Sequence, residues 1–581
     1  MNGLIKKLLV TATCAGFVIA QFVPGQTTTG ASVFKVSAAG TAATAAIPQV
    51  PPPPPPNICS VIPCQVPIPT VTHTPAQVRT FFDWFSWESF IALNWPVLVT
   101  GGSVQRGQAD NTKTIGDLST PRVWESWKAE WELFRPASAN NPGVPGTPSG
   151  WSSYNLDPNV LPCANATVPF LKSGGKVLVM STKMDSVLNQ INEAMGGPLI
   201  DQNCAYARYE IRVDESEYNF IVNPPPPNPP GKPFYIKANQ PASGASNYPI
   251  NFASSTTSTP FPLPSCQPSQ NPCTYGAIEI KAAWREMKPG DDLSRYYTVN
   301  ALLVENTNVS ATCRQAKMGL VGLHIGHKVS AFREWVWSTF EQVDNVPPDG
   351  YKPNVGPPPP ACSGTKSPFS LNNGFAYPPT TDGYSTEPSS VTPPLSQNPS
   401  PPVQVLRNTP IVYQNQVSPT TQDINQQFQK ALSGTVWQYY QLVVTQWPRK
   451  SGLFVPFPAG YANYPTTCDL PIPTDVTFSG IPSGEAIMAV ANTTMETYYQ
   501  TTTMRIASCM HCHYLASGQD FSFMLNMEAF VPPSEIAKLR ATRRSTSDPI
   551  GRMRGFIQQN RTTHNLKYQR LLKQTKASQK K

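Results

Sequence analysis

The stretch that decides the fold is Met318-Gly319-Leu320-Val321-Gly322-Leu323-His324-Ile325, an apolar run without a turn signal. A short run of this kind predicts a β-strand that is buried on both faces. Side chains alternate along a strand, so His324 points away from the side that Leu323 and Ile325 share, and His327, beyond Gly326, lies on the opposite face from His324.

Other short runs of alternating apolar and polar residues surround this strand in the sequence. They predict further strands at Lys176–Met180, Tyr209–Val213, Ala277–Ala282 and Tyr297–Val304. The charged residues Glu279, Lys281 and Arg285 flank Trp284 and form either a polar site or the solvated face of a strand. Their alternation favours the solvated face.

Two helices are predicted, one on each side of the strands. The first begins at Thr74-Pro75, a capping residue followed by proline, and ends near Trp95 before Pro96. Its expected buried face consists of Val78, Phe81, Phe82, Phe85, Ser89 and Ala92. The second has apolar residues at helical spacing and is expected to end at Pro448; these residues are Ile424, Phe428, Leu432, Val436, Tyr439 and Val443.

These elements predict an α+β fold with a large β-rich body, flanking helices, long Pro-rich loops and a mostly helical C-terminal haem-binding segment. The 65 prolines cluster in stretches that cannot form a ladder of backbone hydrogen bonds. The expected organisation is a signal peptide (1–20), a flexible lead (21–73), the β-rich body (74–345), a Pro-rich loop region (346–420), the C-terminal segment (421–535) and a basic tail (536–581).

The N-terminus predicts export from the cytoplasm of a bacterium. Lys6 and Lys7 precede an apolar stretch from Leu8 to Ala20, which is typical of a secretory signal peptide and too short to span a bilayer securely. We therefore expect a periplasmic or secreted protein without a membrane span. Cys14 suggests lipid attachment as an alternative, but the residues before it depart from the pattern of a lipobox.

Positive charge is concentrated at the C-terminus. Lys538–Lys581 contains 13 lysines and arginines against the single acid Asp548, so the remainder of the +9 chain is slightly acidic. Such a tail is solvated by default, and it also suits an acidic partner protein or an anionic membrane surface. Export makes nucleic acid the weakest of the possible partners.

Cysteine usage also fits an oxidising compartment. Of the twelve cysteines, Cys59 with Cys64 and Cys266 with Cys273 are spaced for local disulfides, because each pair closes a short Pro-rich loop. The partners of the other cysteines do not follow from the sequence.

The chemistry-bearing motif is Cys509-Met510-His511-Cys512-His513, a single C-x-x-C-H near the C-terminus. Two cysteines at this spacing reach the two vinyl groups of one porphyrin as thioethers, and the following histidine lies beneath the iron. We therefore expect one covalent haem c at Cys509 and Cys512, with His513 as the proximal iron ligand.

A redox dithiol and half of a zinc site are the alternatives for these cysteines. Zinc needs two more ligands at similar spacing, and the chain has no second C-x-x-C. A thioredoxin-like dithiol follows a strand in a βαβ unit, whereas Thr493–Thr503 predicts a short helix or a loop. Export favours haem as well.

Whether the protein supplies a sixth iron ligand decides between the two functions: a ligand from the chain favours electron transfer, and an open position allows a small molecule to bind. Among the six histidines, His324 and His327 lie in the buried run, and His324 is preferred because its setting is more buried. His73 lies in the lead, His564 lies in the tail, and His511 is held between the tethering cysteines. Methionines compete for this place: Met488, Met495, Met504, Met524 and Met527.

Several stretches resemble bacterial exported proteins of the cytochrome c family that have one C-x-x-C-H near the C-terminus. They are Phe90–Pro96, Ile278–Arg285, Met318–Ile325, Trp335–Glu341 and Val436–Tyr440, and the resemblance spans Phe82 to His513. It implies haem and export, places His324 in a shared segment, and implies no substrate. The expected function is electron transfer to an unidentified redox partner; the alternative is a haem enzyme or gas-binding protein, of oxygenase or peroxidase type, with an open distal position.

Overall fold

The computed structural model describes a set of segments of the chain. They are residues 56–66, 75–135, 137–138, 141–153, 176–178, 199–226, 228, 230–241, 250–257, 273–306, 311–329, 335–348, 350–356, 367–375, 402–407, 411, 419–447, 492–497, 513, 519–527 and 529–530. The predicted signal peptide, most of the lead and the basic tail lie outside these residues, as do Cys509 and Cys512.

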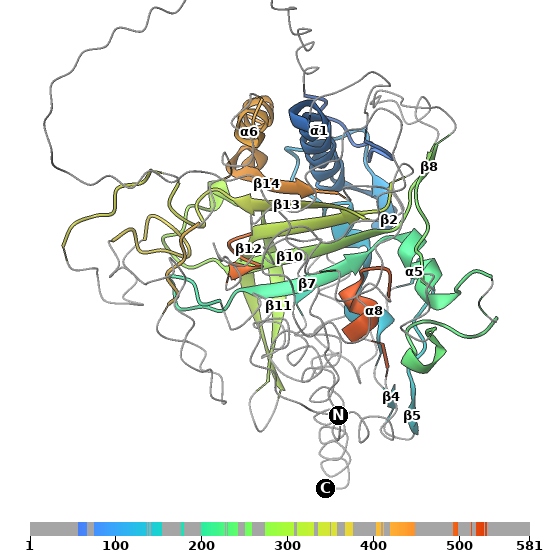
Figure 1. Ribbon diagram of the computed structural model, residues 1–581. Helices are drawn as coiled ribbons and strands as arrows, with labels where there is room; N and C mark the ends of the chain where they lie inside the picture. Colours follow the sequence, from blue (N-terminus) through green and yellow to red (C-terminus); the bar gives the residue numbers. More distant parts are fainter. Residues whose placement is uncertain are drawn as a thin grey trace, which may run out of the picture. The chain divides into compact units, whose positions relative to one another are not determined.

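One eight-stranded sheet organises the described residues (Figure 1). Its strands are β3 (Lys128–Ala129), β6 (Lys176–Leu178), β7 (Arg208–Val213), β10 (Ile278–Glu286), β11 (Thr298–Asn306), β12 (Ala311–His327), β13 (Val336–Gln342) and β14 (Tyr440–Gln446). Each run expected to be a strand overlaps a strand, with Val179 and Met180 lying outside the described residues, and the fold is α+β.

The long strand β12 joins the two parts of this sheet. Its second half lies between β10 and β13, in the order β14-β13-β12-β10-β7-β3, and its first half pairs with β11. Pairing is antiparallel except between β6 and β11. The run Met318–Ile325 is therefore central, which explains why it lacks the polar alternation of an edge strand.

The two faces of the sheet around β12 differ in composition. One face, here called the helix face, includes Leu323 and Ile325 of β12 and Phe340 of β13 in the main apolar core. The other, the His324 face, includes Gly322, His324 and Gly326, with Trp337 and Thr339 of β13 beside them. The alternation predicted for His324 and its neighbours is confirmed.

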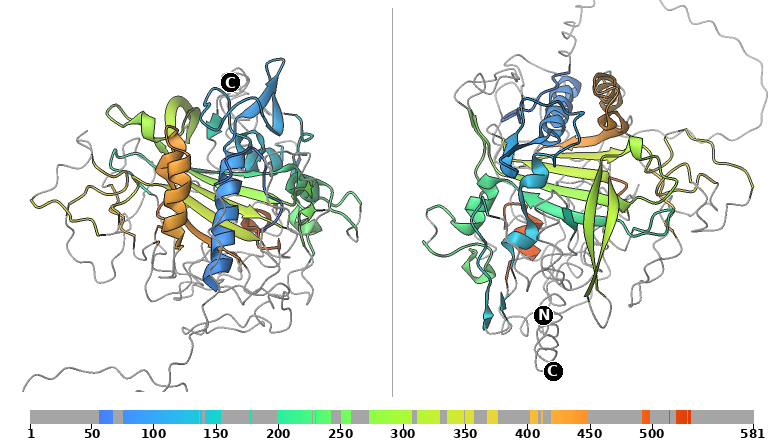
Figure 2. Two further views of the ribbon diagram at one scale, coloured as in Figure 1. Left: turned by 90° about the horizontal axis from the view of Figure 1, so that it is seen from above. Right: turned by 180° about the vertical axis from the view of Figure 1, so that it is seen from behind.

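Helices α1 (Pro75–Leu93) and α6 (Thr421–Ala431) lie side by side over the helix face (Figure 2). The α1 hydroxyl of Ser86 lies 2.7 Å from the hydroxyls of both Ser338 and Thr445. The first helix is confirmed, but it has more than one buried face: Trp84, Trp87, Phe90, Ile91 and Leu93 are buried as well. It lies between the sheet, α6 and the residues after β2, so a single apolar stripe is the wrong description.

The second predicted helix is correct only in its first half. Helix α6 ends at Ala431, and Gly434 then adopts a φ of +84°, a left-handed conformation that stops a helix. Residues Val436–Tyr439 form one turn of 3-10 helix, and the aromatic and β-branched residues from Tyr440 onward form β14. Val443 is thus a strand residue, and the sheet takes up part of the predicted C-terminal segment.

Shorter elements surround the main sheet. Two-stranded sheets are formed by β1 (Val97–Thr100) with β2 (Ser103–Ala109), β4 (Ala137–Ser138) with β5 (Asn141–Pro145), and β8 (Thr256–Thr257) with β9 (Cys273–Thr274). The other α-helices among the described residues are α2 (Glu130–Leu133), α5 (Glu215–Val222) and α8 (Phe523–Met527). Helix α8 lies on the side of the sheet opposite α1 and α6 (Figure 1).

The predicted local disulfide between Cys59 and Cys64 is wrong. Cys64 is in a disulfide, whereas Cys59 is a buried thiol. Because Cys64 already forms a disulfide with a cysteine other than Cys59, it has no sulfur left to bond to Cys59. The predicted Cys266–Cys273 pair lies partly outside the described residues.

No helix among the described residues has the length and apolar character needed to cross a bilayer.

Candidate haem-binding site

The proximal-ligand candidate His513 lies in an aromatic environment. Its imidazole packs against the indole of Trp337 on β13, with ring centroids 3.8 Å apart, and against Phe523 of α8 at 5.0 Å. Trp337 belongs to the His324 face, so the chain just after the C-x-x-C-H cysteines reaches this face of the sheet. Cys509 and Cys512 lie outside the described residues.

The Nδ1 atom of His513 lies 2.7 Å from the carbonyl oxygen of Phe521. A carbonyl can only accept, so Nδ1 carries the proton and donates it, and Nε2 is left as the unprotonated nitrogen. Burial lowers the pKa of His513 to about 3, and the nearby charge of His324 acts in the same direction. The ring is therefore neutral at physiological pH, as a metal-binding imidazole must be.

The distal-ligand candidate His324 projects from the centre of the sheet. It lies opposite Lys281 on β10 and opposite Thr339 on β13, and it is 7% exposed. Its Nε2 lies 3.3 Å from a carboxylate oxygen of Glu496, without the alignment of a hydrogen bond. Burial opposes ionisation of Glu496, but the interactions with His324, Lys281 and the Asn492 backbone together outweigh it, and the pKa of Glu496 is lowered.

Glu496 is placed by a short segment that crosses the His324 face, Asn492–Thr497. The side-chain amide of Asn492 donates to the Thr339 hydroxyl at 2.9 Å and to the carbonyl of Phe340 at 2.8 Å. The backbone N–H of Asn492 donates to Glu496 at 3.0 Å, and the Thr493 hydroxyl donates to Glu341 at 2.8 Å. These contacts fix the carboxylate of Glu496 beside His324.

The structure thus brings His513 and His324 to the same face of one sheet. Because His324 is paired with Thr339, Trp337 is its diagonal neighbour; such positions are about 7–8 Å apart, within reach of an aromatic side chain. His513 lies on that indole. Residues 189 positions apart in the sequence therefore share one environment, and the charge of His324 acts on the ring of His513.

Of the competing ligand candidates, His327 lies on the opposite face of the sheet, whereas Met495 and Met524 lie near the two histidines: Met495 beside Gly322 of the His324 face, and Met524 in the apolar cluster of Trp337 and Phe521. His327 faces the helix side, where its ring stacks with Phe85 of α1 at 5.6 Å. Burial lowers its pKa to about 3. Met495 and Met524 are buried in two apolar clusters of the core. Met488 and Met504 lie outside the described residues.

The solvated face predicted for Glu279, Lys281 and Arg285 is wrong. Glu279 and Arg285 are buried and Lys281 is half-buried; Arg285 pairs with Asp201 and Asp291, and a segment from the C-terminal part of the chain covers Glu279. The Ser522 hydroxyl, just before α8, donates to Glu279 at 2.9 Å. The polar alternation correctly predicted which residues share this face of β10. At Glu279, however, a segment more than 200 residues away in the sequence lies where solvent was expected.

Three neighbours of the histidines were not predicted as site residues. Trp337 lies in an apolar cluster of the core and also packs against His513. Phe521 contributes only its backbone carbonyl, which no side-chain pattern can reveal. Glu496 is a lone acid in a polar stretch, and its only signal is that it comes 13 residues before Cys509.

The residues present fit an iron porphyrin. An imidazole whose Nδ1 donates to a carbonyl is oriented to offer Nε2 to a metal, as ligating histidines usually are. Two buried nitrogens beside it, Nε2 of His324 and Nε1 of Trp337, make no hydrogen bond. Among the described residues there is no cluster of three or more His, Cys, Asp or Glu arranged to hold a bare metal ion.

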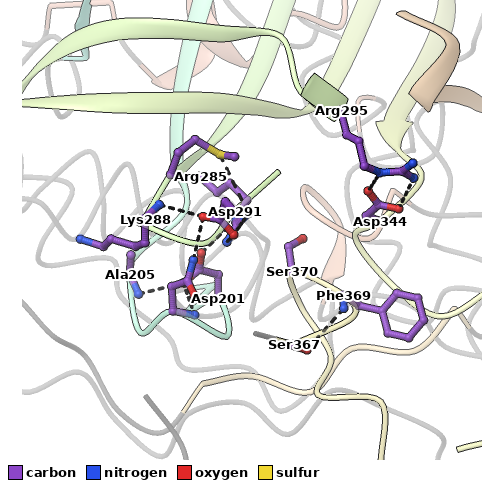
Figure 3. A network of polar contacts seen from close by, with 12 residues as sticks. Asp201, Ala205, Arg285, Lys288, Asp291, Arg295, Asp344, Ser367, Phe369 and Ser370 are labelled. Carbon is purple, nitrogen blue, oxygen red and sulfur yellow. Dashed lines mark hydrogen bonds and ion pairs between the residues drawn. The ribbon is translucent and has the colours of Figure 1, made fainter. Parts of the chain in front are cut away.

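A polar pocket of about 160 Å³ lies elsewhere, beyond the end of β10. Both arginines of its lining are paired within the protein (Figure 3): Arg285 with Asp201 and Asp291, and Arg295 with Asp344 at 2.6 Å. Both guanidinium groups are therefore already bound to carboxylates of the protein.

No protein-family model, no curated protein and no solved structure matches this chain.

Proposed function

We propose that this chain is an exported c-type cytochrome that binds one haem through Cys509, Cys512 and His513 and transfers electrons. The observation that supports it best is the 2.7 Å hydrogen bond from His513 Nδ1 to the Phe521 carbonyl. That bond leaves Nε2 unprotonated, which is the form and the orientation that an iron ligand needs. A dithiol role for the two cysteines gives no reason for this arrangement; a zinc role would suit it, but zinc needs further ligands and the chain has no second C-x-x-C.

His324 is the proposed sixth ligand. It lies on the same face as His513, is buried, and its Nε2 makes no hydrogen bond. A haem c held between two histidines supplies a one-electron iron couple of relatively low potential. The surrounding sheet would then hold both imidazoles on rigid strands and turns, which limits rearrangement when the charge on the iron changes.

The second candidate is a haem enzyme or gas-binding protein with an open distal position. The contact between His324 Nε2 and Glu496 at 3.3 Å favours it, because a histidine paired with a carboxylate is suited to exchange protons with a small molecule. The two candidates differ in one respect, namely whether Nε2 of His324 faces the iron or Glu496.

The proposed setting is the periplasm or the exterior of a bacterium, in line with the predicted N-terminal signal peptide. The electron donor or acceptor is a redox partner protein. The basic tail from Lys538 suits an acidic partner or an anionic membrane surface.

The test is expression of the full chain in a bacterium that matures c-type cytochromes, followed by absorption spectroscopy of the purified protein. The proposal predicts one haem per chain and a low-spin reduced spectrum that carbon monoxide leaves unchanged within minutes. A prompt shift of the Soret band would support the open-position candidate, and absence of haem would overturn both.

A further inference from the structure

The turn that supplies the Phe521 carbonyl has an unusual backbone. Asp520 and Phe521 are consecutive and have φ values of +51° and +65°, in the left-handed region that side-chain-bearing residues rarely adopt. Only one other non-glycine residue in the described segments, Cys204, has a positive φ. Such strain persists only where the surroundings impose it, and it is concentrated at functional sites.

The surroundings of Asp520 impose this conformation from several directions. Its carboxylate accepts hydrogen bonds from the Phe252 backbone N–H at 2.7 Å and from Lys328 Nζ at 2.6 Å. Its backbone carbonyl accepts from the indole N–H of Trp335 at 2.7 Å. Asp520 and Lys328 are both almost completely buried, so the charge pair is shielded from water.

Ser522 and Phe521 connect the turn to further parts of the protein. The Ser522 backbone N–H donates to the Gln519 carbonyl at 3.1 Å, which closes the turn, and its hydroxyl donates to Glu279 on β10. The turn is thus attached to β10, to the residue after β12 and to the residue before β13. Between these attachments, the carbonyl of Phe521 accepts the proton of His513 Nδ1.

We infer that Asp520 is a positioning residue for the iron ligand. Its pairing with Lys328 holds the strained turn so that the Phe521 carbonyl meets His513 Nδ1. An acceptor at Nδ1 makes the opposite nitrogen more basic, and greater basicity stabilises ferric over ferrous iron. Asp520 therefore lowers the reduction potential without touching the metal. This inference rests on the proposed haem.

A second turn in the same chain provides a matched control. Asp201 is also buried, pairs with a buried cation, Arg285, at 3.0 Å, and accepts from the backbone N–H groups of Asn203 and Ala205 around Cys204, whose φ is positive (Figure 3). No histidine is bonded to that turn among the described residues. Arg285 lies six residues along β10 from Glu279, about 20 Å at the rise of a strand.

The experiment compares Asp520→Asn, Trp335→Phe and Asp201→Asn in the full-length haem-loaded protein. Each of the first two removes one attachment of the strained turn, and Trp335→Phe retains an aromatic ring in the core. Two quantities are measured: the reduction potential, and the chemical shift of the His513 Nδ1 proton in the reduced protein.

In Asp520→Asn we expect the preference for ferric over ferrous iron to fall about threefold to tenfold. For one electron this raises the reduction potential by about 30 to 60 mV. Trp335→Phe changes it in the same direction by less, and the Nδ1 proton moves upfield in both. Asp201→Asn destabilises the fold but leaves potential and proton shift unchanged. If Asp520→Asn yields no folded protein, Trp335→Phe decides.

If folded, haem-loaded Asp520→Asn has the potential of the wild type, this inference is overturned and the proposed function stands. The same holds for Trp335→Phe if Asp520→Asn does not fold. An equal rise in Asp201→Asn would also overturn it, since the effect would then be general loosening of the protein. A wild-type protein without covalent haem would overturn the inference together with the proposed function.

Discussion

Gly326 on β12 lies directly opposite Trp337 on β13, and the indole occupies the space where a side chain at Gly326 would be. A Cβ there would come within 2.8 to 3.1 Å of three carbons of the six-membered ring. Trp337 is in turn covered by His513. The glycine thus allows the aromatic contact that supports the candidate iron ligand.

Replacing Gly326 with alanine should push the indole toward His513. Overpacking of this kind costs about 1–3 kcal/mol of unfolding free energy, and the haem absorption spectrum should shift because the imidazole moves with the indole. Denaturant unfolding and absorption spectra of the purified variant measure both effects. Gly143→Ala is the control, because that strand glycine has no atom within 4 Å of the added Cβ; an equal effect there would refute the argument.

Replacing His324 with alanine should remove the sixth ligand. The low-spin reduced spectrum should be lost, and carbon monoxide should then bind promptly. His327→Ala is the matched control, because it removes a histidine from the same strand on the face toward α1. We expect that variant to lose stability but to keep the spectrum of the wild type. A low-spin spectrum that survives in His324→Ala would exclude this histidine as the ligand.

Stability should depend on pH through two buried glutamates, Glu217 of α5 and Glu279 of β10. As carboxylates, neither oxygen of Glu217 has a hydrogen-bond donor. Burial raises its pKa well above 4.5, and the charges of Glu279, Asp214 and Asp520 add to the rise. Burial likewise raises the pKa of Glu279 to about 7. A proton held between the two carboxyl groups satisfies both.

The sign follows from proton binding. Between pH 4.5 and about 7 the folded chain retains a proton that the unfolded chain has released, so the unfolding free energy falls as pH rises through this window. Glu217→Gln supplies a donor and removes one acid. We expect it to be about 1–3 kcal/mol more stable than wild type at pH 8 and similar at pH 4.5.

Chemical denaturation across this pH range measures the effect. Glu215→Gln, an exposed acid in the same helix, is the control and should have nearly the slope of the wild type. Parallel curves for wild type and Glu217→Gln would contradict the shared proton. Asp214, whose pKa burial raises to about 7, is present in all three proteins; Glu215 is the smallest of the causes that act on it, so Glu215→Gln should change the slope only slightly.

Local patterns were sufficient to predict the strands and the first helix. The alternation in Met318–Ile325 predicted that His324 and Leu323 face opposite sides of the sheet. This follows from strand geometry alone and does not depend on which segments cover each side. The second helix failed after Ala431 because Gly434 and the β-branched residues that follow prefer other backbone conformations, and the sheet offered Tyr440–Gln446 a partner strand.

The arrangement of the site was beyond prediction from local patterns for a physical reason. Which side of β12 is covered by helices and which by the C-terminal segments depends on contacts between residues far apart in the sequence. The pairs Glu496 with His324, and Trp337 with His513, join such residues. The acceptor for His513 is a backbone carbonyl, which every residue possesses, so no residue type marks it.

The most direct test of the account is the mass and haem staining of the purified chain after denaturing electrophoresis. Wild type and Cys59→Ser should each retain one covalent haem, and the double variant Cys509→Ser with Cys512→Ser should retain none. A wild-type chain that loses its haem on denaturation, or a double variant that keeps it, would contradict the central claim.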